Sequence, residues 1–394
     1  MRVPFSPPDI REEDIEAVAA VLRSGWITTG PVGREFESGL ADYTGAAGVV
    51  CLNSCTAALE VALRLLGIGP GDEVVVPSYT YTASASVVLH VGATLRLVDS
   101  APGQYVPSIS QILDCVSSRT KAVVVVDLAG VPFAAEELRE ELGRRFSSED
   151  LPLGRPAVIV DGAHSLGATR LKYRAGQLGD FTAFSFHAVK NLTTAEGGAL
   201  GWRDGLSIDD EFLEKTARRL ALHGQDKDAL EKSKAGRWEY DILEPAHKWN
   251  MPDVLAALGL SQLRRYEEMI ARRHEILEMY ADGLSDVLAV LPHRGRDWRS
   301  SAHLALTDLG RCAEYRDEII EMLAGAGVAT NVHYKPLPML TAYRSLGFSM
   351  ADYPHAQAQY ERVLSLPLHT LMTDEDVHFV ITELRHAMST IGLR

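Results

Sequence analysis

The 394-residue sequence predicts an α/β fold: a large domain with a mostly parallel seven-stranded sheet covered by helices, plus a smaller C-terminal α+β domain. Strand and helix patterns alternate from Gly48 to Gly201. The strand segments are rich in β-branched residues and lack polar alternation, which is typical of a sheet buried on both faces. A long helical pattern then separates this region from shorter mixed elements. We therefore expect a large domain over residues 1–250 and, over residues 251–394, a long connecting helix followed by the small domain.

Two helices precede the sheet. An extended proline-containing segment leads into the first, Asp9 or Arg11 to Leu22, and the second is Val32–Tyr43. Between them, SGWITTGP places two glycines and a proline around Trp26, which predicts an irregular loop. This loop is either packed against the core or forms a wall of an active site.

The alternating region supplies the sheet and its covering helices. The expected strands are Gly48–Leu52, Glu73–Val76, Thr94–Val98, Ala122–Asp127, Ala157–Asp161, Phe181–Phe186 and Gly198–Trp202. The expected helices are Cys55–Leu66, Thr80–His90, Ser108–Val116 and Ala134–Phe146.

The C-terminal half begins with helix Asp209–Leu222 and a charged, irregular stretch over 223–249, a length typical of a functional or interfacial loop. A helix is then expected over Met251–Leu284. The small domain comprises strands Ser301–Leu306, Val328–Val332 and Val363–Leu366, and helices Cys312–Ala324 and Thr373–Met388.

Composition limits the class of protein. The net charge is −14, from 39 basic and 53 acidic residues, which argues against nucleic-acid binding because that requires a positive surface. The four cysteines form no CxxC pair and no disulfide framework. The N-terminus lacks an apolar signal core, and no apolar run reaches about 18 residues. We expect a cytoplasmic protein without a membrane segment, and we predict no metal site.

The stretch Gly179–Leu200, GDFTAFSFHAVKNLTTAEGGAL, holds one lysine, Lys190, between two apolar runs. A lysine is usually a solvated surface charge. Near apolar walls its charged form is disfavoured, so the pKa of the amine falls and the amine becomes nucleophilic. A lysine that forms Schiff bases needs this property, so we predict that Lys190 carries pyridoxal phosphate.

Three further segments follow strands of the expected sheet, where ligands of open parallel sheets bind. The first is Asn53–Thr56, where Ser54 is either a plain helix cap or part of a phosphate cup. The second holds Tyr81, which either packs in the core or stacks on a flat ring. The third holds Asp161 and His164.

Asp161 follows four apolar strand residues, so its carboxylate needs a partner. It is either a helix N-cap or the group that pairs with a pyridinium nitrogen. His164 is either a satisfied polar neighbour or a residue that reaches the ring hydroxyl or Asp161. Asp161 precedes Lys190 by 190 − 161 = 29 residues, one strand apart, which is the order a pyridoxal phosphate site requires. Each segment alone is a weak signal, but the four together form a strong one.

At these residues the chain resembles the DegT/DnrJ/StrS family of sugar aminotransferases, within fold type I of the pyridoxal-phosphate-dependent transferases. The resemblance runs nearly the full length, and its most specific part is FSFHAVKN with the following EGG. It also includes the motifs PFSPPDI, SGWITTGPVGREFE, CLNSCTAAL, DGAHSLGA, KWNMPDVLAALGLSQL and VHYKPLPML.

The resemblance implies catalytic roles for two residues. Lys190 would hold the cofactor as a Schiff base and shuttle the proton, and Asp161 would pair with the pyridine nitrogen. Asn250 would reach the cofactor phosphate of the neighbouring subunit, so the site would need a homodimer. The other implied cofactor contacts are Ser54, Cys55, Thr56, Tyr81, His164 and Ser185, and the implied substrate contacts are Trp26, Thr28, His187, His333 and Tyr334.

The implied reaction is transfer of the amino group of L-glutamate to a nucleotide-linked keto-sugar, with pyridoxamine phosphate formed during the cycle. The stretch WEYDILEPAHKWN looks most like members that act on UDP-linked 4-keto-6-deoxyhexoses. Members using dTDP- or GDP-linked sugars, or 3-keto sugars, share most motifs. The alternatives are another reaction on this fold, such as a dehydration, desulfuration or amino-acid lyase reaction, and a non-catalytic regulatory protein.

Overall fold

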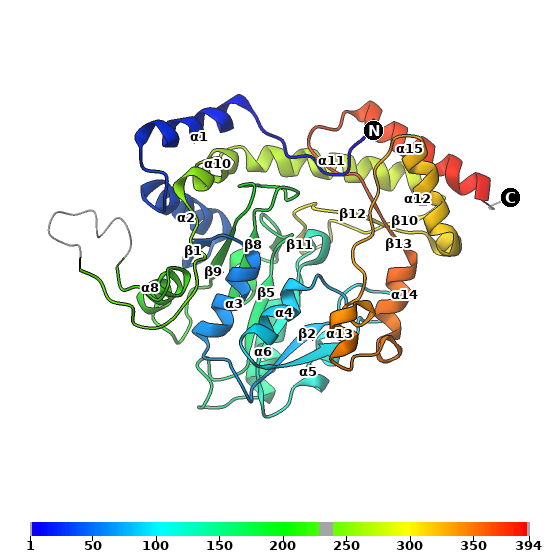
Figure 1. Cartoon of the computed structure of the whole chain (residues 1–394). Coiled ribbons are helices and arrows are strands. Elements are labelled where there is room, and N and C mark those ends of the chain that lie inside the picture. Colours follow the sequence, from blue (N-terminus) through cyan, green and yellow to red (C-terminus); the bar gives the residue numbers. More distant parts are fainter. Residues whose placement is uncertain (1, 228–238, 392–394) are drawn as a thin grey trace.

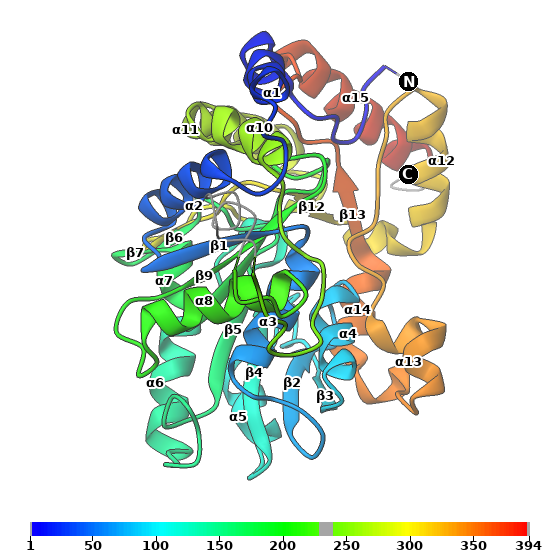
Figure 2. The same cartoon turned by 60° about the vertical axis from the view of Figure 1, so that its left-hand side comes forward.

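The computed structural model describes residues 2–227 and 239–391. A seven-stranded sheet forms its centre, and Figures 1 and 2 show helices packed around it. The strand order is β1-β9-β8-β5-β4-β2-β3. The strands are β1 (Gly48–Leu52), β2 (Glu73–Pro77), β3 (Thr94–Val98), β4 (Thr120–Val126), β5 (Ala157–Asp161), β8 (Phe181–Ser185) and β9 (Gly198–Trp202). The seven strands predicted from the sequence are confirmed, with ends that move by at most two residues.

The sheet is mostly parallel, as predicted. The pairs β2–β3, β2–β4, β4–β5 and β5–β8 are parallel, and β9 runs antiparallel to both β8 and β1. Six strands therefore point the same way, so their carboxyl ends lie at one edge of the sheet. The antiparallel strand β9 begins at that same edge, at Gly198.

Helices cover both faces because successive side chains of each strand point to opposite sides. In β2, Val74 and Val76 pack with α3 (Cys55–Leu65), α4 (Ala83–His90) and α8 (Asp210–Ala221), whereas Val75 packs with helices of the other face. Those helices are α5 (Ile109–Cys115), α6 (Ala135–Arg145) and α7 (Ala175–Leu178). Alternate valines thus bury both faces of one strand.

The prediction of one continuous helix over Met251–Leu284 is wrong. The segment forms two helices, α10 (Asp253–Leu263) and α11 (Tyr266–Leu284). The N-terminal helices α1 (Glu12–Ser24) and α2 (Pro31–Thr44) pack on α10. At the break, Arg265 leaves helical geometry with φ −111° and ψ 10°. Its Nη2 donates to a carboxylate oxygen of Asp14 at 2.8 Å, a tertiary contact that helical periodicity does not register.

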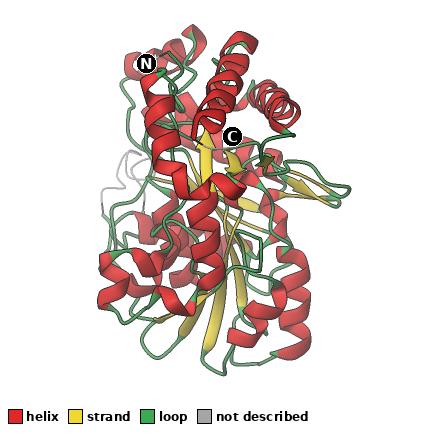
Figure 3. Ribbon diagram, turned by 90° about the vertical axis from the view of Figure 1, so that its right-hand side faces the viewer, coloured by secondary structure: helices red, strands yellow, loops and turns green. Residues whose placement is uncertain are grey.

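The C-terminal part contains a three-stranded sheet in the order β10-β12-β13 with α12 (Arg316–Gly325) and α15 (Asp374–Ile391) packed on it (Figure 3). The strands are β10 (Ala289–Val290), β12 (Ala305–Asp308) and β13 (Val363–Leu366), and helices α13 (Thr341–Ser345) and α14 (Pro354–Arg362) lie between β12 and β13 in sequence. A third small sheet pairs β11 (Trp298–Arg299) with β6 (Thr169–Arg170) and β7 (Tyr173–Arg174).

The strand predicted over Val328–Val332 is wrong. This segment makes only isolated bridges, from Val328 to Val3 and from Asn331 to Ser365. Its backbone partners are divided between the N-terminal segment and β13, so no ladder forms. Helix Cys312–Ala324 is likewise shorter than expected, because Gly310–Tyr315 is a 3₁₀ turn. The domain division between residues 250 and 251 stays a prediction.

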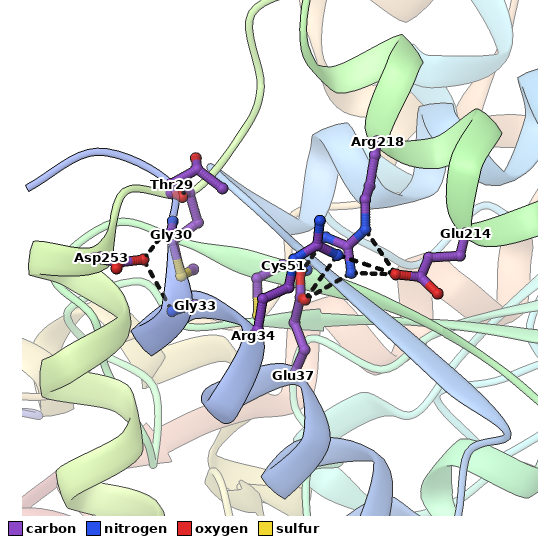
Figure 4. Close-up of polar contacts among 10 residues, drawn as sticks. Thr29, Gly30, Gly33, Arg34, Glu37, Cys51, Glu214, Arg218 and Asp253 are labelled. Atoms are coloured by element: carbon purple, nitrogen blue, oxygen red, sulfur yellow. Dashed lines mark hydrogen bonds and ion pairs between the residues drawn. The ribbon is translucent and has the colours of Figure 1, made fainter. Parts of the chain in front are cut away.

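Asp253, the first residue of α10, holds the loop before α2 in place (Figure 4). Its carboxylate accepts hydrogen bonds from the backbone N–H groups of Gly30 at 2.8 Å and Gly33 at 2.9 Å. In the same region Glu37 pairs with Arg218 of α8 and accepts from the N–H of Cys51 in β1. These buried acceptors fix the SGWITTGP loop and α2 relative to the sheet.

Within residues 2–227 and 239–391, no helix combines the length and apolarity needed to cross a membrane.

Candidate active site

A cavity of about 370 Å³ lies at the carboxyl edge of the central sheet. This volume suits a small organic ligand. Segments that follow β1, β2, β5 and β8 contribute to its wall, and a loop of the C-terminal part closes it. The predicted site residues that line it are Ser54, Cys55, Thr56, Tyr81, Asp161, His164, Ser185, His187, Lys190, His333 and Tyr334.

Asp161, the last residue of β5, is 6% exposed. Its carboxylate accepts from the hydroxyl of Ser84 at 2.6 Å and from the N–H of Ala163 at 3.2 Å. Burial nevertheless raises the pKa of Asp161, although these hydrogen bonds and the charge of Lys190 act in the opposite direction. No helix starts at Asp161, so the alternative of a helix N-cap is wrong. The group is a buried carboxylate that a cationic partner would stabilise.

Lys190 lies in the turn after β8 and is half-buried because it faces the cavity. Burial lowers the pKa of its amine to about 8, while Cys55 and Asp161 act in the opposite direction. Among the described residues, the Nζ atom of Lys190 makes no hydrogen bond or ion pair. The lowered pKa predicted from the flanking apolar runs therefore has its expected cause, and the amine exchanges its proton within about one pH unit of neutrality.

The N-terminus of α3 opens into the cavity beside Lys190. Ser54 caps this helix, since its hydroxyl accepts from the N–H of Ala57 at 3.1 Å. The N–H groups of Cys55 and Thr56 have no acceptor among the described residues, so they are available to an anion. Gly198 passes so close that a Cβ there would lie 2.3 Å from the nitrogen of Cys55. The two interpretations of Ser54, as a helix cap and as part of a phosphate cup, are therefore compatible with each other.

His164 has a defined tautomer. Its Nδ1 accepts from the N–H of Ala129 at 3.2 Å, so its Nε2 carries the proton and donates to the phenol oxygen of Tyr334 at 2.9 Å. Burial holds the pKa of His164 well below its usual range, with the charges of Lys190 and His333 acting the same way. His164 is a satisfied neutral residue and makes no bond to Asp161, and the hydroxyl proton of Tyr334 remains free to donate elsewhere.

Tyr81 stands at the rim of the cavity. It is 60% exposed, which rules out the alternative of core packing, whereas Tyr79 two residues earlier is fully buried. The ring of Tyr81 lies 5.8 Å from the ring of Tyr334, centroid to centroid. An exposed aromatic face beside Lys190 and Asp161 is available to a flat ligand.

Three of the predicted site residues lie elsewhere. Trp26, Thr28 and Asn250 do not line the cavity. Asn250 donates to the hydroxyl of Thr29 at 2.6 Å, and Thr28 accepts from the N–H of Asp253 at 3.1 Å, so the three gather where the SGWITTGP loop meets α10. Part of the stretch 223–249, namely residues 228–238, lies outside the described residues.

The sequence-based reasoning missed Ser84, which binds Asp161, and His303, which lies beside His164 with ring centroids 4.3 Å apart. A signal for Ser84 was present, because TYTASAS places small hydroxyl residues just after β2. For His303, in SAHLAL, no signal distinguishes it from an ordinary core histidine.

These residues fit pyridoxal phosphate. Asp161 is a buried acceptor for a protonated ring nitrogen, Lys190 is an amine of lowered pKa, and α3 offers free N–H groups for a phosphate. A mostly parallel sheet with such a lysine and carboxylate at its carboxyl edge defines a pyridoxal-phosphate-dependent transferase of fold type I.

Comparison with known proteins is consistent with this class. The family model described as the DegT/DnrJ/EryC1/StrS aminotransferase family matches residues 8–385. The chain is 36% identical to the spore coat polysaccharide biosynthesis protein SpsC of Bacillus subtilis, covering 97% of this chain and 96% of SpsC. It is 34% identical to the UDP-4-amino-4-deoxy-L-arabinose–oxoglutarate aminotransferase of Shewanella sediminis, covering 96% of each.

Solved structures agree. One is the pyridoxamine phosphate form of Spr1654 of Streptococcus pneumoniae, which is described as a putative sugar aminotransferase. It superposes with a TM-score of 0.95 at 45% identity, covering 99% of this chain and 100% of that one. PseC of Helicobacter pylori gives 0.87 at 26% identity, covering 98% and 99%. The chain belongs to the DegT/DnrJ/EryC1/StrS aminotransferase family and is a pyridoxal-phosphate-dependent sugar aminotransferase.

Proposed function

We propose that the chain transfers the amino group of L-glutamate to a UDP-linked 4-keto-6-deoxyhexose. The observation that carries the transamination chemistry is that the amine of Lys190, with its lowered pKa, and the buried carboxylate of Asp161 line one cavity. The support for a UDP-linked sugar is the relative from Shewanella sediminis, whose name specifies a UDP-linked amino sugar.

Pyridoxal phosphate, when bound, takes up the amino group of the donor and stabilises the negative charge that develops when the adjacent carbon loses its proton. Lys190 binds the cofactor through its amine and, once displaced, moves that proton as a general base and acid. Asp161, held by Ser84 and Ala163, keeps the ring nitrogen protonated.

The other cavity residues bind and orient. Cys55 and Thr56 would donate their backbone N–H groups to the phosphate, and the hydroxyl groups of Ser54 and Ser185 would lie beside it. Burial raises the pKa of the Cys55 thiol well above its usual value, so this thiol stays neutral and is unsuited to nucleophilic attack. Tyr81 would stack on the cofactor ring, and His164 with Tyr334 would lie near its hydroxyl group.

We also propose a homodimer with shared sites. Asn250, Trp26 and Thr28 lie outside this chain's own cavity and act on the cofactor and sugar of the partner subunit, with His187, His333 and Tyr334 contributing to the sugar site from the same chain. Sedimentation equilibrium tests the dimer, and a monomeric active enzyme would contradict it. Location in the cytoplasm stays a prediction.

Replacement of Gly198 by alanine is expected to weaken pyridoxal phosphate binding by about 10- to 100-fold, since overpacking costs roughly 1–3 kcal/mol. The added Cβ would lie 2.3 Å from the nitrogen of Cys55, so α3 must shift away from the phosphate. Cofactor titration of the apo-protein measures the effect. The matched control is Gly201→Ala on the same strand, whose Cβ would lie 3.3 Å from that of Ala46, and this variant should keep its affinity.

The substrate is tested by incubating the purified holoenzyme with L-glutamate and a panel of keto-sugars on UDP, dTDP and GDP, with the ketone at carbon 3 or carbon 4. Mass spectrometry and NMR identify the amino-sugar and 2-oxoglutarate. We expect turnover with UDP-linked 4-keto-6-deoxyhexoses. A product only from the dTDP or GDP series, or only from 3-keto sugars, would overturn the substrate assignment and leave the transamination chemistry intact.

A further inference from the structure

A second, smaller cavity of about 40 Å³ shares Lys190, His333 and Tyr334 with the first. The N-terminal segment covers it: Phe5 and Ser6 line it, and the hydroxyl of Ser6 donates to the carbonyl of Val189 at 3.1 Å. Its remaining polar lining comes from His303, His333 and Tyr334. The volume exceeds the roughly 10–15 Å³ that one buried water needs.

His303 presents a hydrogen-bond acceptor to this cavity. The side-chain amide of Asn191 donates from Nδ2 to the carbonyl of Ser301 at 2.7 Å, so its Oδ1 faces Nδ1 of His303 at 2.8 Å. A carbonyl oxygen only accepts, so Nδ1 of His303 must carry the proton and Nε2 must hold a lone pair. No hydrogen bond to Nε2 is present among the described residues, although His303 is only 5% exposed.

The surroundings keep His303 neutral. Burial holds its pKa well below the usual range, and His164, Lys190, Arg273 and His333 act in the same direction. Because His164 carries its proton on Nε2 and uses it for Tyr334, the two adjacent histidines have opposite tautomers. Of the two, only His303 has an unused lone pair near Lys190.

We propose that His303 is a positioning residue for Lys190: its Nε2 accepts a hydrogen bond, through one water in the small cavity, from the amine of Lys190. The water has Lys190, His303 and the hydroxyl of Ser6 as polar neighbours, within the two to four that buried waters require. This link would hold the displaced amine in one orientation, so that its lone pair is positioned for the proton transfer. The inference rests on the proposed function of Lys190 as the proton carrier.

Two substitutions of His303 test separately the acceptor that faces the cavity and the hydrogen bond to Asn191. In His303→Asn, the amide nitrogen can replace Nδ1 and keep the contact with Asn191, but the cavity loses its acceptor. In His303→Gln, the amide oxygen can replace Nε2 and the contact with Asn191 is lost. We expect kcat to fall roughly 10- to 100-fold in His303→Asn, as for a misplaced catalytic group, and to stay within a few-fold of wild type in His303→Gln. KM for the keto-sugar should not change in either variant.

The apo-protein provides a readout that does not depend on turnover. Lys190 is labelled with a small aldehyde and borohydride at a series of pH values, and mass spectrometry quantifies the labelled peptide. We expect a midpoint near pH 8 in wild type and His303→Gln. In His303→Asn it should fall by roughly 0.5 to 1 pH unit, the shift expected when the ammonium form loses one hydrogen bond.

A crystal structure of the wild-type apo-enzyme at high resolution tests the water directly. An empty cavity would overturn the proposal, as would an unchanged kcat and midpoint in His303→Asn. If kcat falls in His303→Gln and not in His303→Asn, the contact with Asn191, and not the acceptor in the cavity, is what activity requires, and the proposal is overturned. If wild type aminates no keto-sugar, the proposed substrate fails, while the labelling midpoints and the water still decide the role of His303.

Discussion

Replacement of Lys190 by alanine is expected to lower kcat on the order of 10³- to 10⁴-fold, the upper range of what a positioned acid–base group contributes. Burial brings the pKa of this amine to about 8, so it exchanges a proton near neutral pH, and no other lysine lines the cavity formed by the described residues. The variant would also lack the proposed covalent link to the cofactor, and the visible absorbance of that link should disappear. Steady-state kinetics and absorbance spectra with L-glutamate measure both effects.

Two controls accompany this variant. Lys190→Arg keeps a positive charge but has no amine that can form the link, so it should be as inactive as Lys190→Ala. Lys172→Ala removes an exposed lysine next to Tyr173 and should leave the kinetics unchanged. Repeated turnover of Lys190→Ala at a rate close to wild type would show that another group moves the proton.

Replacement of Asp161 by asparagine should have opposite effects on activity and on stability. In the holoenzyme we expect kcat to fall roughly 10²- to 10³-fold, because loss of a buried charge partner costs about 3–4 kcal/mol. In the apo-protein the same change should raise the melting temperature. Asparagine can still accept from the N–H of Ala163 and can donate to Ser84, so the change removes charge and little else.

The sign follows from the raised pKa of Asp161. A carboxyl group whose pKa is higher in the folded state favours folding below its ordinary pKa, and this contribution is lost as the pH rises through the folded-state pKa. Above the ordinary pKa of a carboxyl group, the burial of Asp161 therefore lowers the stability of the apo-protein, and Asp161→Asn removes that cost. In melting curves of the apo-protein from pH 4 to 8, the melting temperature of Asp161→Asn minus that of wild type should increase as the pH rises.

Asp127 provides the matched control. It is also buried at the end of a neighbouring strand, with a pKa raised by burial to about 7, but it does not line the cavity. Asp127→Asn tests whether a loss of activity follows from neutralising any buried carboxylate near the sheet edge. Its kcat should stay close to wild type; an equal loss in both variants would contradict a specific role for Asp161.

The sequence was sufficient to predict the central sheet and the core of the site. Asp161 and Lys190 end or follow adjacent strands, and parallel strands bring such positions to one edge whatever the details of packing. The lowered pKa of Lys190 was likewise predictable, because the apolar runs around it belong to buried strands. Short-range patterns thus determined which groups meet at the edge of the sheet.

Contacts between distant segments were not predictable in this way. The break between α10 and α11 coincides with the side chain of Arg265 reaching Asp14, 251 residues away in sequence. The failed strand at Val328–Val332 has its backbone partners divided between Val3 and Ser365. Helical and strand periodicity describe only a segment's own neighbours, so neither pattern contained this information.

By itself, the sequence determined the α/β sheet, the lysine and carboxylate at its edge, and through its motifs the family. Only the tertiary structure decided the hydrogen bonds of the site residues. Ser84 bonds to Asp161, Tyr334 to His164, and Asn191 to the ring of His303. The reason is physical. A strand end sets where a side chain starts, but its tautomer, charge and hydrogen bonds depend on partners that folding brings from elsewhere in the chain.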